Sequence, residues 1–178
     1  MEPSKYVEDW AVLERLADKV VPVEGQSYGL KPIGVVVDFQ GEPGVSDNAE
    51  TFLRFRKRAG EGALWRLSRG QGGFRLPFRI KYETPERGSK GKGARSIKLL
   101  TLATDRLKDT VDAALRKSEG GKGAMYLPNW MNDDDTIGEY CAEERGQKGW
   151  EKKKGVVRNE GLDLTVQARA LAEHKGLL

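Results

Sequence analysis

The sequence is poor in cysteine and histidine, the two residue types that most often form zinc sites in proteins. Among 178 residues it contains one cysteine, Cys141, and one histidine, His174. A single cysteine cannot form an intramolecular disulfide, which is typical of a protein from a reducing compartment. A Cys/His zinc site is excluded because it needs four such ligands. Any metal site must use carboxylates, which favour hard ions such as Mg²⁺ or Mn²⁺.

Long apolar segments are also absent. No stretch approaches the roughly 18 apolar residues that a membrane-spanning helix needs. The first ten residues, MEPSKYVEDW, are charged and lack the apolar segment of a signal peptide. What the sequence has instead is charge: 33% of its residues are charged, with a net charge of +4. This mild basic excess permits a polyanionic partner without requiring one.

Helical and strand-like patterns alternate along the chain. Apolar residues at three- and four-residue spacing predict helices over residues 4–20, 47–60, 104–117 and 161–178, with another after the polar segment 132–135. Apolar and β-branched runs predict strands over residues 33–39, 63–70, 74–83, 97–104 and 124–128, with a basic loop or short hairpin over 146–157. Pro77 favours an edge position for its strand. Ser4, Asp47 and Thr104 are expected N-caps. The alternation predicts one α/β domain, a mixed sheet flanked by helices.

Asp38 stands near the end of the apolar strand 33–39. The carboxyl ends of strands are where α/β sheets bind ligands, so Asp38 is a candidate metal ligand. The alternative is that Asp38 turns into the following loop and accepts a hydrogen bond from a backbone N–H, as aspartate often does.

The segment RNEGLD gathers charge at the start of the last helix. Arg158, Asn159 and Glu160 are consecutive, and Asp163 follows. One interpretation is a capped helix start, because Asn159 or Glu160 can cap and Asp163 interacts favourably with the helix dipole. The other is a metal site: if Asp38 and Asp163 converge, they can hold one or two divalent ions that cleave phosphodiesters.

Two basic segments are candidates for phosphate contact. Residues 86–98 are predicted to form a flexible loop in which basic residues alternate with glycine. Its basic residues are Arg87, Lys90, Lys92, Arg95 and Lys98. Lys152 and Lys153 beside Trp150 form a second segment. The alternative for both is a solvated surface. The acidic run Asp133–Asp135 is interpreted as helix N-terminal charge rather than as a metal site.

Several motifs, in order along nearly the whole chain, resemble the C-terminal nuclease domain of the lambda-type phage terminase large subunit. IGVVVDFQG, residues 33–41, resembles that family's second acidic strand. LLTLATDRLKD, residues 99–109, resembles a strand, a turn and a helix that carries a lysine, here Lys108. AMYLPNW, residues 124–130, resembles a further strand. RNEGLD, residues 158–163, is the most specific of these elements.

This resemblance implies an RNase H-like fold and a metal-dependent endonuclease that cuts double-stranded DNA by two-metal hydrolysis during packaging. It implies that Asp38 and Asp163 are the second and third acidic ligands of two Mg²⁺ or Mn²⁺ ions, with Glu160 as a further candidate. Arg158 and Asn159 would shape the motif, and Lys108 would contact DNA. The implied partners are double-stranded DNA, the terminase small subunit, the portal and an ATPase domain, in the host cytoplasm.

Two features depart from the family pattern. The family's first metal-binding aspartate lies on a strand before the helix with which this chain begins, and residues 1–30 contain no such strand. The phosphate-binding pattern G-x-x-x-x-G-K-[ST] is also absent. We therefore expect residues 1–178 to be a partial nuclease domain whose exposed sheet edge allows pairing with a second copy. Two alternatives stay open: an inactive remnant that binds DNA or packaging partners, and an unrelated RNase H-like resolvase.

Overall fold

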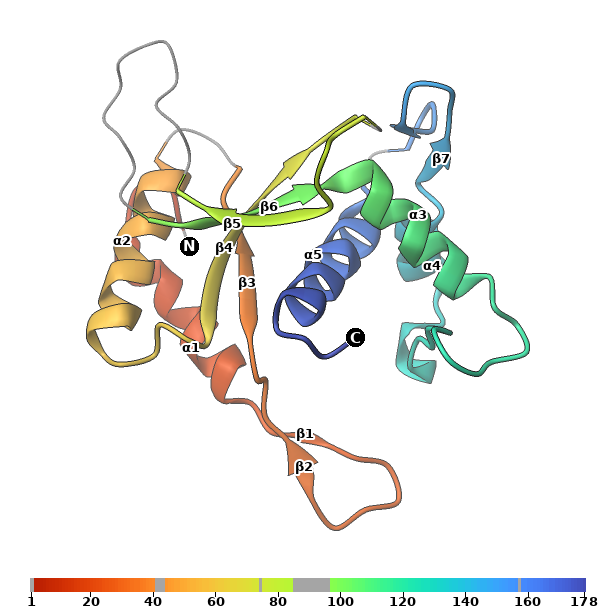
Figure 1. Cartoon of the computed structure of the whole chain (residues 1–178). Helices are drawn as coiled ribbons and strands as arrows, with labels where there is room; N and C mark the ends of the chain where they lie inside the picture. Colours follow the sequence, from red (N-terminus) through yellow and green to blue (C-terminus); the bar gives the residue numbers. More distant parts are fainter. Residues whose placement is uncertain (1, 41–43, 74, 85–96, 157) are drawn as a thin grey trace. The chain divides into compact units, whose positions relative to one another are not determined.

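The computed structural model describes residues 2–40, 44–73, 75–84, 97–156 and 158–178 (Figure 1). It divides the chain into two compact units. Unit 1 comprises Met1–Arg69 and Tyr82–Thr101, and unit 2 comprises Gly70–Lys81 and Leu102–Leu178. Each unit is described in turn, and the single domain expected from the sequence stays a prediction.

A four-stranded sheet has the order β3-β4-β6-β5. Its strands are β3 (Val35–Asp38), β4 (Trp65–Gln71), β6 (Leu99–Ala103) and β5 (Ile80–Glu83). β3 pairs with β4 in parallel, with Val35 opposite Trp65. β5 is an edge strand, as Pro77 predicted, and it begins after the proline, which has no N–H for a ladder. With helices flanking this sheet, the mixed α/β fold is confirmed.

Unit 1 has an aromatic core. The helices are α1 (Ala11–Asp18), which follows the 3₁₀ turn η1 (Val7–Trp10), and α2 (Val45–Arg58). The ring of Phe52 on α2 lies 5.9 Å from that of Trp10 and 5.1 Å from that of Trp65, measured between centroids. All three side chains are buried. Aromatic burial on this scale is a large part of what holds these helices against the sheet.

Four details of unit 1 differ from the sequence predictions. The helix expected over 4–20 is shorter, because it begins as η1 after Tyr6 and ends at Asp18, and Ser4 does not cap it. Asp47 is not an N-cap because α2 begins two residues earlier, after Gly44, whose φ of 92° is easy only for glycine. The strand expected over 33–39 is covered only partly, and its last residue is exposed. A small hairpin, β1 (Val21–Pro22) with β2 (Gly29–Leu30), replaces a predicted connection.

Unit 2 packs three helices and a hairpin. The helices are α3 (Thr104–Leu115), α4 (Asp134–Tyr140) and α5 (Glu160–His174), and a 3₁₀ turn η2 spans Asn129–Met131. The hairpin pairs β7 (Glu143–Arg145) with β8 (Trp150–Lys152). α5 packs against both α3 and α4, burying Leu107 and Val111 of α3 and Leu162 and Val166 of α5. The predicted hairpin is confirmed and begins earlier than expected.

Two predictions for unit 2 are wrong. Thr104 is the first residue of α3 rather than its cap, because the helix follows β6 without an intervening residue. Residues 124–128 form no strand, and Tyr126 is 73% exposed. A strand needs a neighbour for its backbone groups, and no described strand pairs with this segment; the N–H of Met125 donates instead to the carbonyl of Ala114. None of the helices in the described ranges has the length and apolar character of a membrane span.

Candidate functional site

One face of α3 carries charge into the interior of unit 2. Asp105, Lys108 and Asp109 are three and four residues apart and therefore share that face. Asp105 and Lys108 are both buried. The β7–β8 hairpin supplies a partner to each of these side chains, and α5 and Gly73 supply the others.

The side chain of Lys108 bridges two carboxylates. Its Nζ lies 2.6 and 2.7 Å from the two carboxylate oxygens of Glu143 on β7 and 2.8 Å from Oδ1 of Asp163 on α5. The side chains of Lys108 and Glu143 are only 7% and 5% exposed, whereas Asp163 is 40% exposed. Two carboxylates and one ammonium leave an excess negative charge at this site, and of these three side chains Asp163 is the exposed one.

Asn159 joins the two carboxylates from the other side. Its Nδ2 donates to Oε1 of Glu143 at 2.5 Å and to Oδ2 of Asp163 at 2.9 Å. Asn159 occupies the N-cap position of α5, yet its side chain does not cap the helix. The capping interpretation of Asn159 is therefore wrong. Glu160 is exposed, and its carboxylate accepts a hydrogen bond from the N–H of Asn159 at 2.9 Å.

The hairpin that carries Glu143 is fixed by two aspartates of α3. Asp105 accepts hydrogen bonds from the backbone N–H of Trp150 at 2.7 Å and of Gly73 at 2.5 Å. Asp109 accepts from the indole N–H of Trp150 at 2.9 Å. A Cβ at Gly149 would lie 2.8 Å from the Asp105 carboxylate, so only glycine allows this close approach. These contacts set the position of β7 and hence of Glu143.

The helix start that carries Asp163 is fixed by α4. Glu139 accepts a hydrogen bond from the N–H of Gly161 at 2.9 Å, and the hydroxyls of Tyr140 and Thr165 lie 2.7 Å apart. Asp133, the N-cap of α4, accepts from the N–H of Thr136, and this hydrogen bond lowers the pKa of Asp133. The interpretation of the acidic run as helix N-terminal charge is thus confirmed at Asp133.

Asp38 belongs to unit 1. It ends β3, as predicted, and is exposed. Its Oδ1 accepts a hydrogen bond from the N–H of Gln40 at 3.1 Å, which is the turn contact of the alternative interpretation. That contact leaves the carboxylate at the surface, so it does not exclude a ligand role. The convergence of Asp38 with Asp163 of unit 2 stays a prediction.

The predicted phosphate-binding residues are only partly described. Arg87, Lys90, Lys92 and Arg95 lie outside the described residues. Lys98 is exposed, as are Lys152, Lys153 and Arg158. Lys108 differs from all of these because it is buried and ion-paired, so its position favours a role inside the carboxylate cluster over one on the surface.

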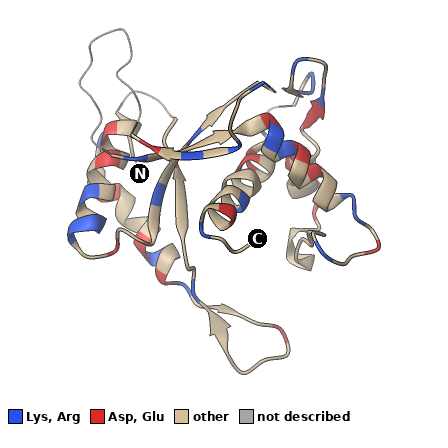
Figure 2. Ribbon diagram, in the orientation of Figure 1, with Lys and Arg blue, Asp and Glu red and all other residues tan. Residues whose placement is uncertain are grey.

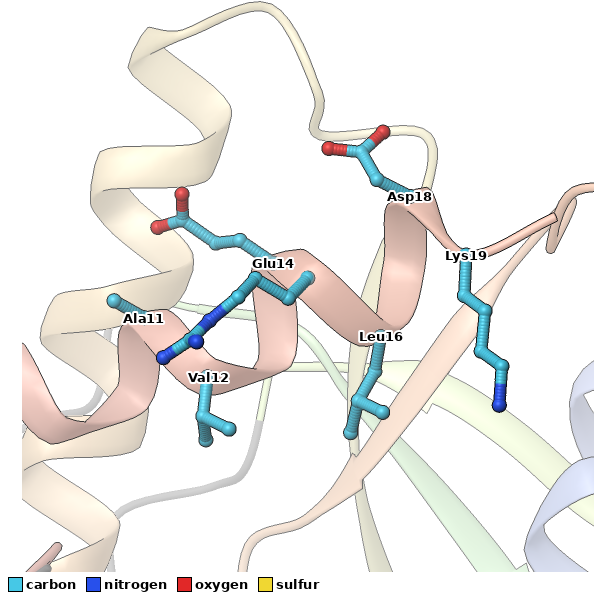
Figure 3. Close-up of a pocket in the computed structure, with 7 residues that line it drawn as sticks. Ala11, Val12, Glu14, Leu16, Asp18 and Lys19 are labelled. Carbon is cyan, nitrogen blue, oxygen red and sulfur yellow. The ribbon is translucent and has the colours of Figure 1, made fainter.

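A pocket of about 790 Å³ runs along α1 in unit 1. Figure 3 shows Glu14 and Asp18 on one side of the helix and Val12 and Leu16 on the other. Its lining brings no carboxylate cluster or nucleophile together, so it is not the candidate active site.

The whole chain, residues 1–178, matches the family model of the terminase large subunit gpA endonuclease domain. The chain belongs to this family. No curated protein and no solved structure matches it. The four-stranded mixed sheet flanked by helices is consistent with an RNase H-like nuclease domain. Membership supports a nuclease role in DNA packaging and, in general terms, DNA and packaging partners.

The cluster of unit 2 fits a hard metal ion in its chemistry. Its donors for a cation are the carboxylate oxygens of Glu143 and Asp163, which suit Mg²⁺ or Mn²⁺. The ammonium of Lys108 already occupies a cation position between them. Across the described ranges, no group of three or more Cys, His, Asp or Glu side chains is arranged to hold a metal. The described cluster therefore offers two carboxylates to a cation, and the ligand role of Asp38 stays a prediction.

Glu143 is the member of this cluster that sequence reasoning missed. It lies in the run CAEER, where charged neighbours make it look like an ordinary surface residue. The only sequence signal is indirect: Trp150 and the following lysines suggest a hairpin, and Glu143 stands at the equivalent distance on the other side of its turn, opposite Lys152.

Proposed function

We propose that this chain is a divalent-metal-dependent endonuclease that cuts double-stranded DNA during packaging. The cluster of Lys108, Glu143, Asn159 and Asp163 is the part of the active site that unit 2 supplies. The observation that carries the proposal is the buried ammonium of Lys108 between two carboxylates, one of which ends the family's most specific motif.

The roles follow from the contacts. Glu143 and Asp163 supply oxygen ligands, and Asn159 fixes the orientation of both carboxylates through hydrogen bonds, as supporting residues of metal sites do. Lys108 limits the repulsion between the carboxylates and supplies positive charge toward a phosphate at the open, Asp163 side. Asp38 is the proposed ligand from unit 1. Two bound ions, Mg²⁺ or Mn²⁺, would activate water and stabilise the leaving oxygen.

The second candidate function is an inactive module that binds DNA or packaging partners. One observation favours it: Lys108 already neutralises part of the charge that would attract a metal, so the cluster can be a purely structural ion network. Such a module should bind DNA with a steep salt dependence and without any need for a divalent ion.

The test combines Mn²⁺ titration calorimetry with nicking of supercoiled plasmid. The variants are Glu143→Gln, Asp163→Asn and Asp38→Asn, which remove charge with little change in shape. The matched control is Asp112→Asn, on the same helix as Lys108 but paired with the exposed Arg116. We expect each of the three variants to lose more than about 100-fold in nicking, because even residues that only support a ligand cost 10- to 100-fold. Asp112→Asn should retain activity.

Two results would contradict the nuclease proposal. The first is nicking that survives in both Glu143→Gln and Asp163→Asn. The second is a wild-type chain that neither binds Mn²⁺ nor nicks plasmid, yet binds duplex DNA equally well in EDTA and in Mn²⁺; this result would establish the second candidate instead.

A further inference from the structure

Two basic side chains of unit 1, Arg66 and Lys98, stand next to buried apolar residues of β4 and β6. Trp65, Leu67 and Leu99 are buried in the same core as Phe52 of α2. Arg66 lies between the first two along β4, and Lys98 directly precedes Leu99. Because successive side chains of a strand point to opposite faces, Arg66 points away from that core, and Lys98, which comes just before β6, is exposed. Figure 2 shows basic residues in blue on the strands of this sheet.

A single tyrosine ring brings these two cations together. The guanidinium carbon of Arg66 lies 5.1 Å from the ring centroid of Tyr82 on β5, and Nζ of Lys98 lies 5.7 Å from the same centroid. Each contact is a favourable cation–π interaction. Together, the two contacts hold two positive charges close to each other. The repulsion between these charges is unfavourable unless an anion shares the site.

No carboxylate supplies that anion within the part of the chain that the structure describes. Other arginines do have acidic partners: Arg54 pairs with Glu50, Arg79 with Glu173 and Arg145 with Asp109. Arg66 and Lys98 form no ion pair with any described residue. The two cations on Tyr82 are therefore not neutralised by the described residues around them.

The guanidinium of Arg66 is also held in place. Its Nη1 donates to the carbonyls of Gly62 at 2.6 Å and of Trp65 at 2.8 Å. Both of these hydrogen bonds come from Nη1, and Nε is buried without a hydrogen-bond partner among the described residues. A fixed arginine whose Nη2 is not used in these hydrogen bonds loses little entropy when it binds a phosphate oxygen.

We propose that Arg66 and Lys98, spaced by Tyr82, bind backbone phosphates of duplex DNA. The inference deepens the proposed function, because it assumes DNA as the substrate and assigns a grip on it outside the carboxylate cluster. Lys98 was expected to act from a flexible loop; the structure gives it a defined ring contact instead. Arg66 was not expected at all, because an arginine in a strand that also contains Ser68 and Arg69 carries no distinct sequence signal.

The test measures duplex DNA binding by fluorescence anisotropy in EDTA, from 50 to 200 mM salt. Wild type is compared with Lys98→Gln and with Arg66→Gln/Lys98→Gln. The matched control for Lys98→Gln is Lys31→Gln, which removes one exposed charge from the same unit. The slope of log K against log salt is negative, and each lost phosphate contact should make it less steep by about 0.9. Between 50 and 200 mM salt, the affinity of the wild-type chain should therefore fall by a factor about ten times larger than the affinity of the double variant.

A double variant with the wild-type slope overturns the proposal, as does a Lys31→Gln control that changes as much as Lys98→Gln. A wild-type chain that does not bind duplex DNA overturns it too. Lys98 is exposed, so Lys98→Gln tests the site even where Arg66→Gln perturbs folding. Binding in EDTA separates this proposal from the nuclease proposal: a less steep salt slope in the double variant supports the two phosphate contacts whether or not the wild-type chain nicks plasmid in Mn²⁺.

Discussion

The two units place their charged residues in opposite ways. Unit 1 buries aromatic and aliphatic side chains around Phe52, and its buried polar residues are the uncharged Ser68 and Thr101. Unit 2 buries Asp105, Lys108 and Glu143 beside its leucines and valines. The described ion pairs of unit 1, such as Arg54 with Glu50, have at least one exposed partner.

The difference indicates where function lies. Removing charge from water costs several kcal/mol per ion unless partners compensate, and a buried pair is seldom more stable than an apolar replacement. A unit designed for stability alone would resemble unit 1. Unit 2 instead holds three charged side chains in the interior, and two of them belong to the cluster that includes the family's motif. The comparison therefore favours unit 2 as the source of the carboxylate cluster, while the proposed contributions of unit 1, Asp38 and the cations Arg66 and Lys98, lie outside its apolar core.

The largest expected effect comes from Phe52→Ala in unit 1. Deleting this ring leaves a cavity between Trp10 and Trp65 and should lower the free energy of unfolding by about 4 kcal/mol. Urea unfolding would be followed in two Trp→Phe backgrounds, one keeping only the tryptophans of unit 1 and one keeping only Trp130 and Trp150 of unit 2. Each background serves as the reference for its own Phe52→Ala variant.

We expect Phe52→Ala to lower the urea midpoint most when unfolding is followed by the tryptophans of unit 1. Equal shifts for both reporter sets would show that the two units unfold as one, and the comparison would then describe two parts of a single cooperative structure.

Lys108→Met in unit 2 should rank second, at about 3 kcal/mol. The change keeps the length of the side chain but leaves the buried carboxylate of Glu143 without its cation, and breaking a buried pair costs about 3–5 kcal/mol. The lower end is expected because Asp163 is partly exposed. Urea unfolding at neutral pH is the measurement.

The matched control in unit 1 is Arg54→Met, which removes one partner of an exposed pair and should cost less than about 1 kcal/mol. A Lys108→Met/Glu143→Leu double variant should recover most of the lost stability. If the two single variants cost the same, burial of charge does not distinguish the units.

The fold was predictable wherever a local pattern determines it. The apolar runs of β4 and β6 and the periodic positions of α3 specify their elements without tertiary information. The errors occurred where the surrounding structure decides. Residues 124–128 have strand-like composition but pair with no described strand, and α2 begins at Val45 because the backbone turns at Gly44. Local propensity determines neither the absence of this strand nor the first residue of α2.

The site divides in the same way. Asp163 and Asn159 were predictable because their motif is contiguous in sequence. Glu143 was not, because it reaches Lys108 only through pairing of β7 with β8 and the anchoring of that hairpin on α3. Three segments that are distant in sequence meet at the ammonium of Lys108, and their spacing in the sequence does not predict this contact.

Asp105→Asn tests this anchoring and should cost about 2 kcal/mol, since hydrogen bonds to a charged group contribute about 1.5–3 kcal/mol. The amide oxygen can accept from only one side, so its NH₂ group must face the N–H of either Trp150 or Gly73. Amide hydrogen exchange should show faster exchange at Trp150, with Asp112→Asn as the unperturbed control. Unchanged exchange at both amides would mean that the hairpin is held without Asp105.

The smallest effect concerns an ion pair at the rim of unit 2. The guanidinium of Arg79 donates to both carboxylate oxygens of Glu173 at 2.8 Å, and this hydrogen bonding lowers the pKa of Glu173 below its ordinary value of 4.5. A carboxyl group whose pKa is lowered by folding stabilises the folded state at every pH above its ordinary pKa. This stabilisation is lost as the pH falls through the lowered pKa. As the pH falls from 5 into the acid range, the free energy of unfolding should therefore fall more for wild type than for Glu173→Gln. Urea unfolding at each pH measures both values. Parallel pH profiles for the two proteins would show that the pair contributes nothing. In that case only buried charge, and not surface pairing, would separate unit 2 from unit 1.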